Sequence, residues 1–187
     1  MKRHDALIGE PLALDLVNTR PADADLLDGP EGLADWLARQ SDRYPELAGF
    51  DAIPAAAVTA AGAVRELVDE SVTALLEGRP VPPGVVEGLN RALRAAPVHK
   101  RLAMEDGIAV VTTERSGTSA ERLAAILAEA AAELLANPGI GKLKQCEADD
   151  CRLVFLQTHP RRRWCSAERC GNRVRVARYY QQNKKSS

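Results

Sequence analysis

The sequence predicts a mainly helical α+β protein with two domains. The expected N-terminal domain is helical with one β-hairpin, and a small cysteine-containing domain follows, built from a hairpin and a C-terminal helix. Three observations predict this class. Apolar residues recur with helical spacing over most of the first 141 residues, one segment there has the pattern of a hairpin, and all four cysteines fall in the last 46 residues.

Charge and turn residues place the border between the two domains. Residues 142–187 hold 12 Lys and Arg against 4 Asp and Glu, a balance of +8, whereas residues 1–141 carry −9 and the whole chain −1. The stretch from Asn137 to Gly141 contains Pro and two Gly, which end helices and punctuate chains. We therefore expect an acidic domain at 1–141 and a basic domain at 142–187.

Local signals predict the elements of the first domain in order. An apolar run at 12–19 predicts a short buried helix, and a cap at Asp28 followed by Pro30 and Glu31 predicts a helix to about residue 40. Apolar spacing predicts helices over about 51–77 and 83–96, and a capping box of Thr118 and Glu121 predicts a last long helix. Residues 99–104 and 108–113 flank the turn signal Glu-Asp-Gly, which predicts a hairpin near 99–113.

Several classes of protein are disfavoured. No apolar run approaches the ~20 residues that span a bilayer, and Glu10, Pro11 and Asp15 interrupt a would-be signal peptide, so a cytoplasmic protein is expected. The Ala-rich and Arg-rich composition suggests a bacterial source. The sequence offers no nucleophile with a plausible partner, no phosphate loop and no paired carboxylates, so an enzyme is not predicted.

Two polar residues stand out in the apolar run at 12–19. Asp15 and Asn18 lie three apart on one side of the expected helix, and polar groups in such a place need partners. They either cap neighbouring helices or tie down the N-terminus, or they form a ligand pocket together with Arg20. His99 is expected to be an ordinary strand residue.

The cysteines predict a metal site in the second domain. Cys146, Cys151, Cys165 and Cys170 have the spacing C-x4-C-x13-C-x4-C, and two short-spaced pairs suit a tetrahedral thiolate site. Four sulfurs would make one Zn²⁺ structural, closed to water. A domain of this size usually needs such a staple, because its own apolar core is small. Disulfides, an iron–sulfur cluster and a redox switch that releases zinc are the alternatives.

The residues around the cysteines predict how the site is displayed. A strand is expected at 152–157, a turn at 158–160, a return strand from about 162 to 164 and a helix over 171–182. A treble-clef zinc finger has this order: a zinc knuckle with the first cysteine pair, a hairpin, and a second cysteine pair at the N-terminus of a helix. Arg173 falls within the apolar arc of that helix, so we expect it to stack on an aromatic ring or bond to turn carbonyls.

The remaining basic residues of this domain predict contact with a phosphate backbone. Arg175, Arg178 and Gln182 share one face of the expected helix, and Asn172 borders that face. Concentrated positive charge is the electrostatic footprint of nucleic-acid binding. The expected DNA-binding residues are Arg161, Arg162, Arg163, Asn172, Arg175, Arg178 and Gln182.

Two motifs of the sequence resemble known families. Trp164-Cys165-Ser166 and Cys170-Gly171-Asn172-Arg173, with Cys146 and Cys151 before them, resemble the CGNR zinc finger. The run Leu12-Ala13-Leu14-Asp15-Leu16-Val17-Asn18-Thr19 resembles the opening of the ABATE domain that accompanies it. The resemblance implies a stress-induced bacterial transcriptional regulator with structural zinc at the four cysteines. This chain departs from the usual pattern after Gln157, where the turn leads straight to Arg161 without a longer basic loop.

Together these observations predict a zinc-stapled module that binds DNA. The N-terminal domain would act as a sensor or a dimerisation unit, with a small-molecule effector or a second copy of the chain as its partner. The alternative is a protein-interaction adaptor, whose basic module docks an acidic partner.

Overall fold

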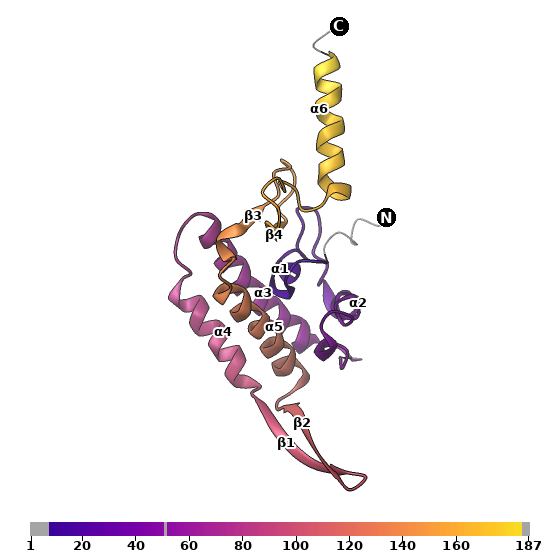
Figure 1. Ribbon diagram of the computed structural model, residues 1–187, viewed down its shortest axis with the longest axis vertical. Helices are drawn as coiled ribbons and strands as arrows, with labels where there is room; N and C mark the ends of the chain where they lie inside the picture. Colours follow the sequence, from indigo (N-terminus) through magenta and orange to yellow (C-terminus); the bar gives the residue numbers. More distant parts are fainter. Residues whose placement is uncertain (1–7, 51, 185–187) are drawn as a thin grey trace.

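The computed structural model describes residues 8–50 and 52–184. Three helices of its N-terminal domain pack side by side: α3 (Ala55–Leu76), α4 (Pro83–Ala95) and α5 (Ser119–Ala136). The short helix α1 (Leu12–Val17) packs on α3 and α5, and α2 (Gly29–Gln40) packs on α3 (Figure 1). These elements confirm the predicted helices, although the predicted start of the third at Asp51 lies outside the described residues.

The core of this domain is built from Leu, Val and Ala. All six residues of α1 are buried, and α3 and α5 bury one apolar stripe each. The capping box at the start of α5 is present, with Thr118 and Glu121 bonding each other's backbone N–H groups. Asp28 occupies the N-cap position of α2, as predicted, although its side chain makes no capping hydrogen bond. In the described part of the chain, no helix is both long and apolar enough to cross a membrane.

The predicted hairpin joins α4 to α5 and projects from the helical body. Its strands β1 (Val98–Glu105) and β2 (Ile108–Arg115) are antiparallel, with Glu105 opposite Ile108. Asp106 and Gly107 form the connecting turn with φ of 49° and 80°. Positive φ at both central residues is the geometry of a type I′ turn, which the sequence Asp-Gly favours.

The cysteine-containing domain has a different hairpin from the predicted one. Strand β4 (Val154–Leu156) pairs with β3 (Leu143–Gln145), which precedes the first cysteine pair. Residues 162–164 form no strand, so the predicted return strand is wrong. The turn before them is closed by the N–H of Arg162 on the carbonyl of His159, and the Gln157 amide then donates to the Arg162 carbonyl at 2.9 Å. That amide occupies a backbone acceptor that a return strand would need.

The last elements lead away from the body. One π-helical turn (Ala167–Gly171) carries the fourth cysteine and continues into α6 (Asn172–Lys184), two residues longer at its end than predicted. Helix α6 extends beyond the rest of the molecule, at the end opposite the β1–β2 hairpin (Figure 1). By contrast, Leu143 and Val154 are buried in the same core as the N-terminal helices, so the base of the second domain packs into the first.

Candidate metal centre and its basic surroundings

The four cysteine sulfurs meet at one point. Cys146, Cys151, Cys165 and Cys170 place their Sγ atoms within 4.8 Å of one another, and all four residues are buried. Cys146 follows β3, Cys151 precedes β4, Cys165 ends the loop after β4 and Cys170 lies in the π-helical turn. Residues from four local structures therefore form a single cluster, as the spacing predicted.

Backbone hydrogen bonds hold the first pair in a tight loop. The N–H of Cys146 donates to the carbonyl of Leu153 at 2.8 Å, and the N–H of Cys151 donates to that of Ala148 at 2.9 Å. The second pair is bracketed by Ser166, whose hydroxyl accepts from the N–H of Arg169 at 3.0 Å. Each pair is thus fixed by its own turn, and the N–H of Glu147 donates to the carbonyl of Arg163 at 3.0 Å, which links the first loop to the segment before Cys165.

The sulfur separations fit one tetrahedral metal ion. Cys151 and Cys165 lie 3.9 Å apart between Sγ atoms, and Cys165 and Cys170 lie 3.6 Å apart. A zinc ion bound at ~2.3 Å by four sulfurs needs S–S edges of about 3.8 Å, whereas a disulfide needs ~2.05 Å. All four cysteines are free thiols. The set fits a single structural Zn²⁺ with no position left for water.

The thiols also perturb one another. Hydrogen bonds from Cys151 and Cys165 lower the pKa of Cys146 to about 2, and hydrogen bonds with Cys146 and Cys151 raise the pKa of Cys165. A cluster of this kind stabilises a thiolate at one sulfur by holding protons on its neighbours. A bound dication would take the place of those protons and offset half of the charge of four thiolates.

Arg173 supports the fourth ligand from α6. Its guanidinium donates to the Sγ of Cys170 at 3.6 Å and forms an ion pair with Asp150 in the loop between Cys146 and Cys151. These contacts raise the pKa of Arg173, with the Asp150 hydrogen bond as the main cause. The predicted structural role is present, with a thiol and a carboxylate as the partners in place of a ring or turn carbonyls. Arg173 thereby links α6 to the loop between Cys146 and Cys151.

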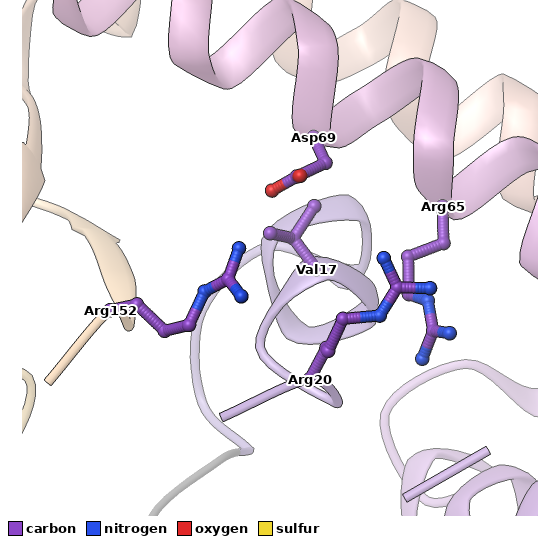
Figure 2. Close-up of a pocket in the computed structure, with 5 residues that line it drawn as sticks. All are labelled: Val17, Arg20, Arg65, Asp69 and Arg152. Atoms are coloured by element: carbon purple, nitrogen blue, oxygen red, sulfur yellow. The ribbon is translucent and has the colours of Figure 1, made fainter. Parts of the chain in front are cut away.

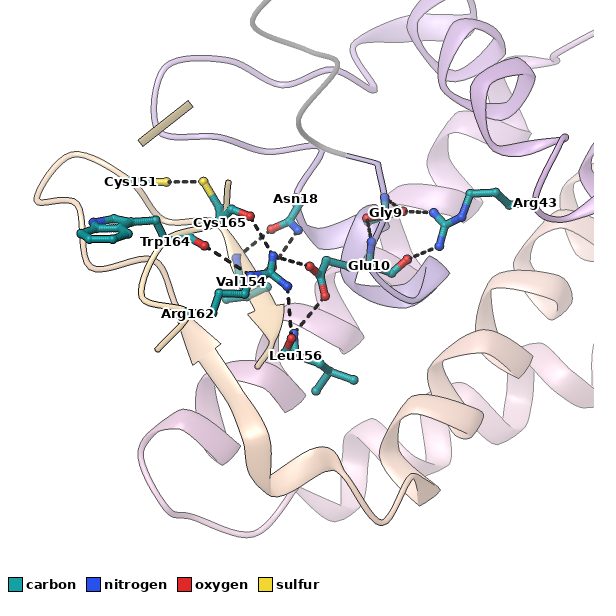
Figure 3. A network of polar contacts seen from close by, with 11 residues as sticks. Gly9, Glu10, Asn18, Arg43, Cys151, Val154, Leu156, Arg162, Trp164 and Cys165 are labelled. Atoms are coloured by element: carbon teal, nitrogen blue, oxygen red, sulfur yellow. Dashed lines mark hydrogen bonds and ion pairs between the residues drawn. The ribbon is translucent and has the colours of Figure 1, made fainter. Parts of the chain in front are cut away.

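Arg162, one of the expected DNA-binding residues, has several partners within the chain. Its guanidinium pairs with Glu10 at 2.6 Å and donates to the carbonyl of Cys165 at 2.7 Å (Figure 3). It also lies 4.2 Å from the centre of the Phe155 ring. Three quarters of its side chain is buried. Glu10, which also accepts from the N–H of Leu156, is a site residue that the sequence reasoning missed, because nothing local marks a contact 152 residues away.

The other expected DNA-binding residues lie in different settings. Arg163 pairs with Glu147 and lies over the Trp164 ring, and Asn172 accepts from Arg175 at 3.0 Å. Arg161 is exposed on the loop after β4. Arg178 and Gln182 lie on α6, but their side chains are outside the described part of the structure.

Asp15 and Asn18 do not form the predicted ligand pocket. Asp15 is fully buried and accepts hydrogen bonds from the N–H groups of Gly9 and Glu10 and from the side chains of Gln40 and Arg43. Burial is the main influence on its pKa and raises it. The first of the two expectations, that these residues tie down the N-terminus, is the one the contacts support.

Arg20 lies beside a small cavity between the two domains. The cavity has a volume of about 10 Å³ and is lined by Val17, Arg20, Arg65, Asp69 and Arg152 (Figure 2). This volume holds about one water molecule. Arg65 is 4% exposed and forms a two-pronged ion pair with Asp25 at 2.6 Å, a network that the sequence reasoning also missed. The sequence signal for this network was Arg65 itself, a charged residue directly beside the apolar stripe of α3.

Comparison with known proteins assigns both parts of the chain. Residues 142–183 match the model of the CGNR zinc finger. No curated protein matches the chain. Residues 10–138, more than half of the chain, match the ABATE model, which is described as "Putative stress-induced transcription regulator". Both descriptions are of regulator and zinc-finger types rather than of enzymes. The chain therefore belongs to the ABATE family and carries a CGNR zinc finger after the ABATE domain.

Proposed function

We propose that this zinc-binding regulator contacts DNA through one face of α6. The observation that carries the proposal is the projection of a basic helix from the zinc site, away from the acidic body (Figure 1). Zinc and the β3–β4 hairpin fix the start of that helix. Its 13 residues span about 20 Å, a length suited to lying in or across a groove of the duplex.

The charges around α6 select one face. Asp149 and Asp150 lie in the loop beside Arg173, Val174 and Ala177, so that side of the helix carries acidic groups. At 100° per residue, Arg175, Arg178 and Gln182 share an arc of about 60°, whose centre lies about 125° around the helix from that side. A phosphate backbone would be repelled by the first side and attracted by the second. Arg161 and Asn172 remain candidates at the base of the helix.

The N-terminal domain enters this proposal as the support of the zinc module. Glu10 holds Arg162, and Arg162 holds the carbonyl of Cys165, so the domain reaches the metal site through two contacts. We infer that a change in the segment before α1 would be transmitted to the start of α6. A sensing role would act through this segment.

The proposal is tested by titrating the zinc-loaded full chain into a fluorescent duplex at several salt concentrations. Wild-type protein should bind at low salt, and the log of affinity should fall linearly with the log of salt concentration. Arg175→Ala should weaken binding and reduce that slope by about 1, whereas Arg94→Ala, an equal loss of charge on α4, should change neither. Absence of binding at low salt, or equal behaviour of the two variants, would contradict the proposal.

The adaptor function has one observation in its favour. Arg162, a basic residue of the zinc module, is already docked on a carboxylate of the acidic body. Polyglutamate titrated under the same conditions separates the two functions. Binding to polyglutamate that equals binding to the duplex would favour the adaptor, and a clear preference for the duplex would favour DNA.

A further inference from the structure

The β1–β2 hairpin exposes an unusual amount of apolar surface. Leu102, Met104, Ile108 and Val111 are each 61–70% exposed, and Val98 is 46% exposed. The hairpin extends from the helical body at the end opposite α6 (Figure 1). Single exposed apolar residues are ordinary, but a group on one projecting element indicates an interaction surface.

The two faces of the hairpin differ. Leu102 lies opposite Val111 and Met104 opposite Ala109, so these side chains share one face with Val98. The other face is mixed: Glu114 pairs there with Arg101 at 2.9 Å and lies 3.7 Å from His99, while the exposed Ile108 lies opposite Glu105. A two-stranded hairpin is marginally stable by itself in water. An additional strand beside it would give this ribbon the width that stable sheets have.

One edge of the hairpin is open for that strand. The N–H of Ser116 donates to the carbonyl of Pro97 at 3.4 Å, and hydrogen-bonded pairs alternate along an antiparallel ladder from there. The N–H and C=O groups of Lys100, Leu102 and Met104 therefore point away from β2. Within the described residues the sheet has two strands only, so this edge of β1 has no partner strand.

We propose that the strand is β1 of a second copy of this chain, paired antiparallel about a two-fold axis through Ala103. In this register Arg101 lies opposite Glu105 of the second copy, and Lys100 lies opposite its Asp106. Leu102 lies opposite Met104, so the apolar face of each hairpin continues into the other. Each contact occurs twice, as in every interface of this symmetry.

Neighbouring registers are less favourable. A shift of the axis to Leu102 places Lys100 opposite Met104, and a shift to Arg101 places Arg101 opposite itself. Opposite charges directly across a strand pair stabilise it, and like charges destabilise it. The charges of β1 therefore favour the axis at Ala103 over these two, and this pairing gives a four-stranded sheet with the two helical bodies at its opposite ends.

Sedimentation equilibrium of the full zinc-loaded chain tests the interface. Wild-type protein should form a dimer, and Glu105→Arg should weaken it on the order of tenfold, because the new arginine faces Arg101 of the other copy. Glu105 is chosen because, among the residues that the structure describes, no cation forms an ion pair with it. Glu87→Arg, the same charge reversal on an exposed position of α4, should leave the dimer unchanged.

A mixture of two variants tests the register. Arg101→Glu and Glu105→Arg should each dimerise poorly alone, whereas mixing them should restore dimers, because the heterodimer has opposite charges at both contacts. Circular dichroism checks that each variant folds, since Arg101→Glu also loses its bond to Glu114. A monomeric wild-type protein, a dimer indifferent to Glu105→Arg, or a mixture without recovery would overturn the proposal.

Discussion

Asn18 completes a strand with its side chain. Its Nδ2 donates to the carbonyl of Val154 at 2.9 Å, and its Oδ1 accepts from the N–H of Val154 at 2.9 Å (Figure 3). The amide thus satisfies both backbone groups of a residue 136 positions away, as a neighbouring strand would. Through this contact α1 holds the hairpin that positions the first cysteine pair.

Replacing this amide should destabilise the chain. Asn18→Ala leaves the buried N–H and C=O of Val154 without partners, so we expect a loss of about 2–4 kcal/mol in the free energy of unfolding. Urea denaturation measures it, and hydrogen exchange at Val154 should accelerate as well. Asn90→Ala, on an exposed position of α4, is the matched control. Equal stabilities of the two variants would contradict this role.

Asp15 should be as sensitive in the N-terminal core. Asp15→Asn turns an acceptor of four hydrogen bonds into a group that donates toward other donors, Arg43 among them. We expect a loss of about 2–4 kcal/mol by urea denaturation. Asp35→Asn removes an exposed ion pair with Arg39 and should cost at most ~0.5 kcal/mol. A small loss for Asp15→Asn would show that the network does not hold the N-terminal segment.

Arg173 should control how firmly the metal is held. Arg173→Ala removes the bond to Cys170 and the tie to Asp150, and changes of this kind near a site weaken metal binding by about 10–100-fold. Zinc transfer to a coloured chelator measures the release rate. Arg175→Ala, two residues along the same helix, should release zinc like the wild type. Arg173→Lys should retain little of the wild-type zinc affinity, because one ammonium cannot hold both Cys170 and Asp150 in the same geometry.

The ion pair of Asp25 and Arg65 predicts a pH dependence. The hydrogen bond from Arg65 lowers the pKa of Asp25 from 3.8 to about 2 in the folded chain. A depressed pKa stabilises the fold above the unfolded value, and this contribution is lost as pH falls from about 4 to 2. Asp25→Asn should therefore be less stable than wild type at neutral pH. The expected loss in the free energy of unfolding is only about 1–2 kcal/mol, because solvent screens the partly exposed Asp25.

The measurement is the difference in unfolding free energy between wild type and Asp25→Asn across that range. Both proteins lose zinc in acid, so the difference cancels this effect. The difference in unfolding free energy should shrink as pH falls from 4 to 2. A constant difference would contradict the assignment of the ion pair.

The sequence predicted the parts whose signals are local. The helices at 55–76 and 83–95, the Asp-Gly hairpin and the Thr118 capping box each follow from periodicity or from the conformation of a few adjacent residues. The cysteine cluster followed from the preference of a thiolate site for two short-spaced pairs. In these cases the interactions that decide the structure lie within a short stretch of chain.

The parts that the sequence did not reveal depend on distant contacts. Strand β3 has three residues, too few for a periodic signal, and its pairing with β4 is set by the docking of both on the helical core. Arg162 stands in a run of three arginines that are alike in sequence, yet Glu10 draws that one inward. Which polar residues are occupied and which remain exposed was decided by tertiary structure.

The central claim is that one zinc ion, held by four thiolates, fixes the start of α6. Elemental analysis combined with X-ray absorption on reduced, natively purified protein tests it most directly. The account predicts one zinc per chain with four sulfurs at ~2.3 Å. Protein that carries no metal, or zinc with nitrogen or oxygen among its ligands, would contradict it.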